Sequence, residues 1–134
     1  MNCLKIALAA LVALALPAAA QGVQRQIIPV AGDVYLFQNN FHMSLIVATP
    51  EGTLRVDPIN AEAWLNDNLA SIGAGPVTHL VYSHSHGDHG SGGAAHPGAT
   101  VIMHEAAPEA IDGVAATLRV GDTHVIELGV KPSS

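Results

Sequence analysis

The sequence predicts an α+β domain in which a mixed sheet carries helices packed on one face. Two patterns lead to this prediction. Short apolar segments separated by turn residues come first, and apolar segments then alternate with helical ones. The chain has 134 residues, of which 49% are hydrophobic and 12% charged, so it can bury one modest core. We therefore expect a single domain.

The segment 1–20 has the pattern of a signal peptide. Lys5 gives a basic start, residues 6–16 are an apolar run, and residues 17–20 are small enough for cleavage. The run is roughly half of the about 20 apolar residues that a membrane-spanning helix needs. We therefore expect residues 1–20 to direct the protein to the periplasm or outside the cell, and residues 21–134 to form the domain.

Residues 21–134 carry four basic and eleven acidic groups, and they hold all eight histidines but no cysteine. An acidic surface argues against nucleic acid and anionic membranes as partners, because both require Lys and Arg to neutralise phosphate. The expected partner is a small-molecule substrate. The high histidine content indicates metal binding or proton transfer.

The first expected elements are strands at residues 27–30, 34–37, 44–48 and 53–56. A helix is expected over residues 61–72, because Trp64, Leu65, Leu69 and Ile72 share one face, and Asn60 is its expected cap.

Two buried strands are expected next, at residues 77–82 and 100–103, separated by a glycine, serine and histidine loop. A short helix over 108–114 and a hairpin over 117–128 that turns at Gly121 and Asp122 complete the expected elements. Functional loops of such sheets leave the carboxyl ends of strands. Asp57 and His84 each follow a strand, so we expect them to lie near each other.

Four side chains that can bind metal lie within six residues, at His84, His86, Asp88 and His89. In extended chain, residues two apart point the same way, so His84 and His86 can bind one ion. Gly87 permits a turn that directs Asp88 and His89 to a second position. Imidazole with carboxylate suits zinc, iron or manganese better than copper. Two such ions can share a hydroxide, and they can hold both the attacking and the departing oxygen of a hydrolytic step.

Two alternative roles for this segment fit the residues less well. A solvated histidine-rich loop would not require four donors at this spacing. A serine hydrolase would place its nucleophile in a Gly-x-Ser-x-Gly turn, and neither Ser83 nor Ser85 lies in one.

Residues 81–93, which read V-Y-S-H-S-H-G-D-H-G-S-G-G, resemble the metallo-β-lactamase superfamily, whose signature is His-x-His-x-Asp-His followed by glycines. The resemblance implies an αβ/βα sandwich, two zinc ions, with iron or manganese as alternatives, and a metal-bound hydroxide that attacks a lactam, ester or thioester type substrate. It also implies that His84 and His86 bind the first ion, that Asp88 and His89 bind the second, and that Asp88 is catalytic because it orients the hydroxide.

In this family, three further metal ligands come later in the chain, whereas this sequence stops at Ser134. We therefore expect only the first, amino-terminal half of the fold. The alternative to an active hydrolase is a catalytically inactive truncated fragment that at most binds a metal ion, and a third candidate is a metal-sequestering module. The uncovered sheet face is expected to favour self-association.

The histidines outside the motif are expected to have no part in metal binding. His124 is expected on a strand face of the last hairpin, and His96 and His104 are expected as ordinary loop or strand-end residues near the site. No role is assigned to His42 or His79.

Overall fold

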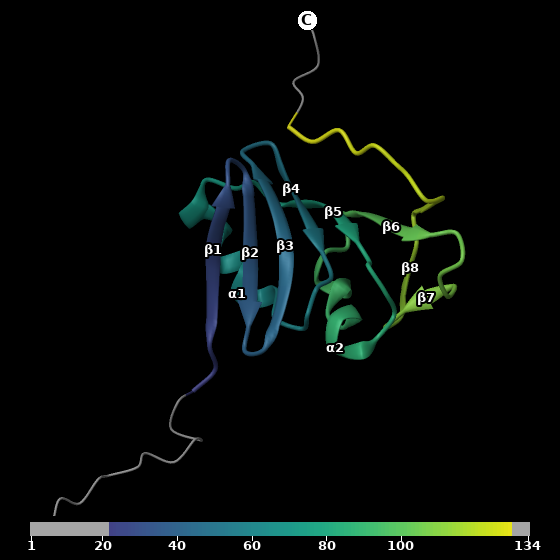
Figure 1. Ribbon diagram of the computed structural model, residues 1–134, viewed down its shortest axis with the longest axis horizontal. Helices are drawn as coiled ribbons and strands as arrows, with labels where there is room; N and C mark the ends of the chain where they lie inside the picture. Colours follow the sequence, from purple (N-terminus) through teal and green to yellow (C-terminus); the bar gives the residue numbers. More distant parts are fainter. Residues whose placement is uncertain (1–21, 130–134) are drawn as a thin grey trace, which may run out of the picture.

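The computed structural model describes residues 22–129, and the expected signal peptide at residues 1–20 lies outside them. The main feature is a seven-stranded mixed sheet in the order β1-β2-β3-β4-β5-β6-β9 (Figure 1). Its strands are β1 Arg25–Ala31, β2 Val34–Asn39, β3 His42–Thr49, β4 Gly52–Val56, β5 Val77–Val81, β6 Thr100–His104 and β9 Leu118–Val120. Strands β1 to β4 form an antiparallel meander, and β4, β5, β6 and β9 run parallel. The mixed sheet predicted from the sequence is confirmed.

Helices are short and pack around the sheet. Helix α1 spans Glu62–Asn68 and continues into a 3₁₀ turn, η2 Leu69–Ile72, so the helix expected over 61–72 is confirmed. Single turns, α2 Gly87–Gly90 and η3 Gly93–Ala95, follow β5. Within residues 22–129, no helix is long and apolar enough to cross a membrane.

The core lies between α1 and one face of the meander. Phe37 and Ile46 on neighbouring strands are fully buried against Leu65 and Leu69. The Phe37 ring also stacks on Trp64, with ring centroids 5.5 Å apart. A second cluster, around Leu80, Tyr82, Val101, Met103 and Ile111, fills the space beside the parallel strands. Apolar residues alternate along each strand of the meander, so they line one face of the sheet. Helix α1 packs on that face.

The helix expected over residues 108–114 is wrong. This segment is a β-hairpin, β7 Ala110–Ile111 with β8 Val114–Ala115. Asp112 and Gly113 form its two-residue turn, both with positive φ, at 48° and 75°. An Asp-Gly pair is a strong signal for such a turn, and the sequence interpretation overlooked it.

The hairpin expected over residues 117–128 is also wrong. Strand β9 pairs in parallel with β6, and residues 121–129 form no strand. Its hydrogen bonds are made to the sheet rather than to the residues that follow, so His124 does not lie on a strand face. The expected cap is wrong as well, because Asn60 makes no side-chain bond to α1 and the cap position is Ala61.

Glycines after the histidine motif allow close packing. A Cβ atom on Gly90 would lie 2.6 Å from Cγ2 of Ile111, so only glycine lets α2 rest on the β7–β8 hairpin. Gly92 has φ of 102° and lies against the backbone of Asn60. Gly90 and Gly92 thus allow the loop after β5 to pack closely against its neighbours.

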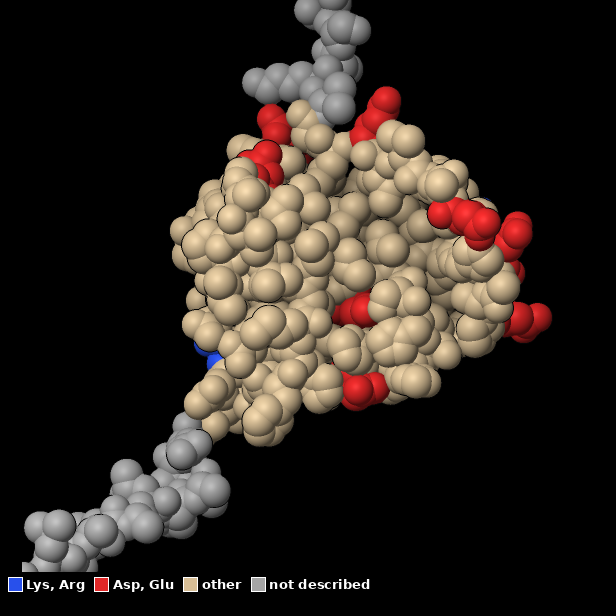
Figure 2. Space-filling view, in the orientation of Figure 1, with Lys and Arg blue, Asp and Glu red and all other residues tan. Residues whose placement is uncertain are grey.

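The sheet face opposite α1 has no helix over it among the described residues. Leu36, Leu45 and Val47 lie on this face and are partly exposed, and Met43 is 46% exposed. Figure 1 looks onto this face, and Figure 2 shows no acidic or basic side chain at its centre over β1 to β3.

Candidate metal centre

The candidate site lies where β4 and β5 end. These strands are parallel neighbours, so their carboxyl ends share one edge of the sheet. Asp57 follows β4, and its backbone N–H donates to the carbonyl of Val81, at 2.9 Å. The backbone N–H of Ser83 donates to Oδ1 of Asp57, at 2.8 Å. The expected proximity of Asp57 and His84 is confirmed, with 4.0 Å between Oδ2 and Nδ1.

Three groups of donor atoms converge at this edge, each with its atoms within 4.8 Å of one another. The groups are His84, His86 and Asp88; His42, Asp88 and His89; and Asp57, His84 and His89. The structure therefore brings together all four residues that the sequence motif singled out. Asp88 belongs to two of the groups, so it lies between two candidate ion positions.

Asp57 and Ser83 determine which nitrogen of His84 is free. The Ser83 hydroxyl donates its only hydrogen to Oδ2 of Asp57. Nδ1 of His84 lies 2.7 Å from the same hydroxyl oxygen, so Nδ1 is the donor of that bond. The lone pair of the ring is then on Nε2. This tautomer is the one that a metal ion needs at Nε2.

His89 is oriented in the same way. Its Nδ1 is buried without a hydrogen-bond partner, 3.6 Å from Oδ2 of Asp57, while its Nε2 lies 4.0 Å from Oδ2 of Asp88. A carboxylate behind Nδ1 is the usual support of a metal-binding histidine. Asp57 is only 5% exposed, so it acts as a positioning residue behind the rings.

The Asp88 carboxylate has the properties of a ligand. Its side chain is 54% exposed and faces the histidines. Desolvation raises the pKa of this carboxyl, but a bond from its own backbone and the nearby His89, His42 and His86 lower it, and the net shift is downward. Asp88 is therefore ionised throughout the neutral pH range.

The loop between β4 and α1 has an unusual backbone. Asp57, Ile59 and Asn60 all have positive φ, at 52°, 43° and 52°, which is unfavourable for a branched residue such as Ile59. Hydrogen bonds to the histidine loop hold this conformation: Ile59 N–H donates to the His89 carbonyl at 3.0 Å, and Asn60 N–H to the Ser91 carbonyl at 2.8 Å. Such strain persists only where the surroundings over-determine it.

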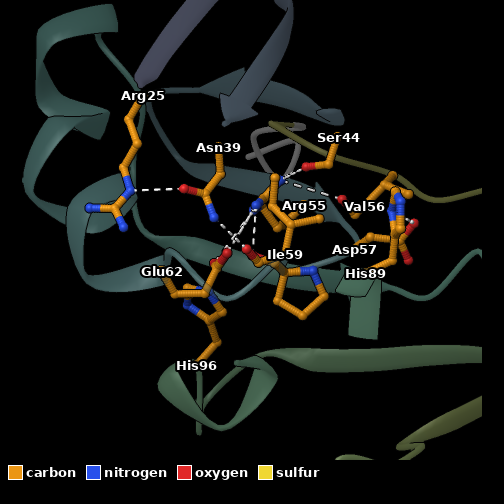
Figure 3. Close-up of polar contacts among 11 residues, drawn as sticks. Arg25, Asn39, Ser44, Arg55, Val56, Asp57, Ile59, Glu62, His89 and His96 are labelled. Carbon is orange, nitrogen blue, oxygen red and sulfur yellow. Dashed lines mark hydrogen bonds and ion pairs between the residues drawn. The ribbon is translucent and has the colours of Figure 1, made fainter. Parts of the chain in front are cut away.

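A buried ion-pair network contacts the loop between β4 and α1 (Figure 3). Arg55 has no exposed side-chain area, and its Nη2 donates to Oε1 of Glu62 at 2.9 Å and to the Pro58 carbonyl at 3.0 Å. Glu62 also contacts Nε2 of the buried His96, and Arg55 donates to the Ser44 hydroxyl. His96 is thus a member of a buried network rather than an ordinary loop residue. Burial lowers the pKa of Arg55, and Glu62 and Asp57 oppose this shift.

A cavity of about 370 Å³ opens beside His84. Ala106, Ala107, Pro108 and Ile111 form its apolar wall, and Ser83 and Ser85 lie on the side of the metal centre. Among residues 22–129, no Arg lines it. The cavity therefore suits an uncharged part of a ligand next to the donor groups.

Sequence reasoning missed two residues of this site. His42 was given no role, yet its Nε2 lies 3.4 Å from Oδ2 of Asp88. Arg55 and its network were not noticed, because nothing in the sequence indicates that Glu62 and His96, 34 positions apart, are in contact. The other histidines, His79, His104 and His124, belong to none of the donor groups found among residues 22–129.

Fold and site together define a class of protein: a mixed sheet with a histidine and aspartate centre at the carboxyl ends of its parallel strands. No protein-family model and no curated protein matches the sequence. Solved structures do. The metallo-β-lactamase SMB-1 bound to 2-mercaptoethanesulfonate is 24% identical, covers 57% of this chain and 32% of its own, and has a TM-score of 0.51.

Two further structures match over more of the chain. A metallo-β-lactamase from Pontibacter korlensis is 21% identical, with 77% of this chain and 56% of its own covered, and a TM-score of 0.55. The mono-zinc form of FIM-1 from Pseudomonas aeruginosa is 16% identical, with 71% and 49% covered and a TM-score of 0.53. The chain spans between about a third and just over half of these structures. It therefore has part of the metallo-β-lactamase fold.

Replacing Arg55 by Ala should destabilise the protein by about 3 to 5 kcal/mol, because Glu62 would be left as a buried charge without its partner. Chemical denaturation followed by circular dichroism measures this change. Arg119→Ala is the control, since Arg119 is exposed and donates to backbone carbonyls in exposed hydrogen bonds, and it should shift stability by no more than about 0.5 kcal/mol. Equal losses in the two variants would show that the buried network is unimportant.

Proposed function

We propose that this chain is part of a metal-dependent hydrolase of the metallo-β-lactamase superfamily, acting on a lactam, ester or thioester type substrate. One observation carries the proposal: His84, His86, Asp88 and His89 converge at the carboxyl ends of β4 and β5, on a fold shared with metallo-β-lactamases. A fold alone hosts many reactions, so the argument rests on the chemistry of the site.

The residues present fit zinc. Imidazole nitrogen and carboxylate oxygen are its usual donors, and they also accept iron or manganese. The buried Nδ1 of His89 supports this, since it faces the Asp57 carboxylate at 3.6 Å and leaves Nε2 as the outward nitrogen. His84 and His86 would hold the first ion and His89 the second, with Asp88 between them.

The residues would divide the chemistry as follows. A bound divalent ion supplies Lewis acidity and lowers the pKa of an adjacent water molecule. Asp88, which is ionised and exposed, would accept a hydrogen bond from such a water and hold it beside the substrate. Through the Ser83 hydroxyl, Asp57 keeps the ring of His84 in the tautomer that leaves Nε2 free, and its carboxylate lies behind Nδ1 of His89. The apolar wall at Ala106 to Pro108 would take the uncharged part of the substrate.

A second candidate is a catalytically inactive chain that binds a metal ion. Its support is the donor groups alone, which can hold an ion whether or not a reaction follows. The two candidates differ in turnover. Zinc-loaded protein assayed against a panel of lactam, ester and thioester substrates separates them, and turnover that disappears with a chelator supports the hydrolase.

The variant His84→Ala/His86→Ala should lose the first ion, since both of its imidazole ligands are removed. Elemental analysis of protein dialysed against zinc should show at least one ion fewer than in the wild type. The control is His124→Ala, which removes an exposed histidine outside the donor groups. Unchanged zinc content in the double variant would mean that the metal site is assigned to the wrong residues.

We also propose that the protein works in the periplasm or outside the cell, on the strength of the basic, apolar and small-residue pattern of residues 1–20. Expression of the full chain in a Gram-negative host should give a product that begins after residue 20, in the periplasmic fraction. Fractionation and amino-terminal sequencing measure this. An uncleaved product that remains in the cytoplasm would contradict it.

Self-association with a second copy is a further proposal for the face opposite α1. Its support is that Leu36, Leu45 and Val47 are partly exposed there and no charge lies at its centre (Figure 2), so two copies could meet without desolvating ions. Sedimentation velocity of the chain should show dimers or larger species. In Leu45→Lys, which places a charge on this face, the monomer should increase. A monodisperse wild-type monomer would exclude the association.

A further inference from the structure

We propose that His42 is a third protein ligand of the second metal position, together with Asp88 and His89. This inference rests on the proposed metal centre and adds a residue that lies outside the histidine motif. Nε2 of His42 is 3.4 Å from Oδ2 of Asp88, and the His42 ring stands edge-on to His89 with centroids 5.4 Å apart. The donor atoms of the three residues all lie within 4.8 Å of one another.

The backbone places His42 there firmly. It is the first residue of β3, paired with Asn39 across the β2–β3 turn. Asn40 occupies this turn with φ of 54°, and its N–H donates to the carbonyl of Gln24, at 2.7 Å. Nδ2 of Asn39 donates to the Ile59 carbonyl, at 2.9 Å, and is buried. The hairpin is therefore tied to the strained loop that begins with Asp57, and His42 is held in register with the metal centre.

A simple surface contact between a histidine and an aspartate is the competing possibility. The chain contains a matched example, because Nε2 of His104 lies 3.4 Å from Oδ1 of Asp122. Within the part of the chain that the structure describes, that pair belongs to no group of three donors, and Asp122 is fully exposed. His42 differs because a second imidazole, that of His89, faces the same carboxylate. An exposed ion pair contributes little stability, so it does not account for the convergence of three donors.

A third ligand changes what the centre can hold. Asp88 and His89 alone give two donors, whereas catalytic zinc sites ordinarily have three protein ligands and one open position. With His42 the second position reaches this number. The first position, at His84 and His86, also has three donors when Asp88 is shared. The described chain thus offers three donors to each position.

The test is a zinc titration of the whole chain by isothermal calorimetry, with a competing chelator, in the wild type, His42→Ala and His104→Ala. His42→Ala should lose one ion or bind it at least about 100-fold more weakly. Loss of a residue that only hydrogen-bonds to a metal ligand weakens binding by about 10- to 100-fold. The other ion should bind as before. His104→Ala should match the wild type, and circular dichroism should show that both variants are folded.

A second measurement does not depend on a variant that folds. In wild-type protein with ¹⁵N-labelled histidine, the Nε2 resonance of His42 should move on addition of zinc, and that of His104 should not. If the His42 resonance stays in place, or if His42→Ala binds both ions with wild-type affinity, His42 is not a ligand, and the proposed metal centre can still stand. If the wild type binds no zinc at all, the proposed function fails as well.

Discussion

The candidate centre depends on one buried carboxylate. Asp57 accepts hydrogen bonds from the backbone N–H and the hydroxyl of Ser83, and its Oδ2 faces Nδ1 of both His84 and His89. A single group therefore joins β4 to the loop after β5 and lies behind two imidazoles. Without it, the rings could rotate, and their free nitrogens would no longer point to common positions.

This carboxylate is itself held by an arrangement that is unfavourable in isolation. Asp57, Ile59 and Asn60 have strained backbone angles, and Arg55 and Glu62 are charged groups removed from water. Each is compensated locally, because Arg55 bonds to Glu62 and to the loop carbonyls, and the loop bonds to the backbone of His89 and Ser91. The strained loop and the buried pair of Arg55 and Glu62 thus stabilise each other and hold the centre in place.

Much of the fold could be predicted from the sequence. Short apolar segments between turn residues identified the four strands of the meander and both buried parallel strands, and the spacing of Trp64, Leu65 and Leu69 identified α1. Predictions failed after β6, where Asp112 and Gly113 form a turn inside a segment taken for a helix, and where β9 finds its partner in β6. Strand pairing over a distance is set by tertiary contacts, and local propensity does not reveal it.

The sequence by itself determined the donors that lie close together, because His84, His86, Asp88 and His89 share one loop and a short spacing fixes their proximity. Only the tertiary structure decided which other side chains reach the same place. His42 comes from β3, Arg55 from β4 and Glu62 from α1, and sheet order and backbone hydrogen bonds bring them to the loop that carries the motif. Distance along the chain carries no information about such contacts, because they form only when the sheet closes around its core.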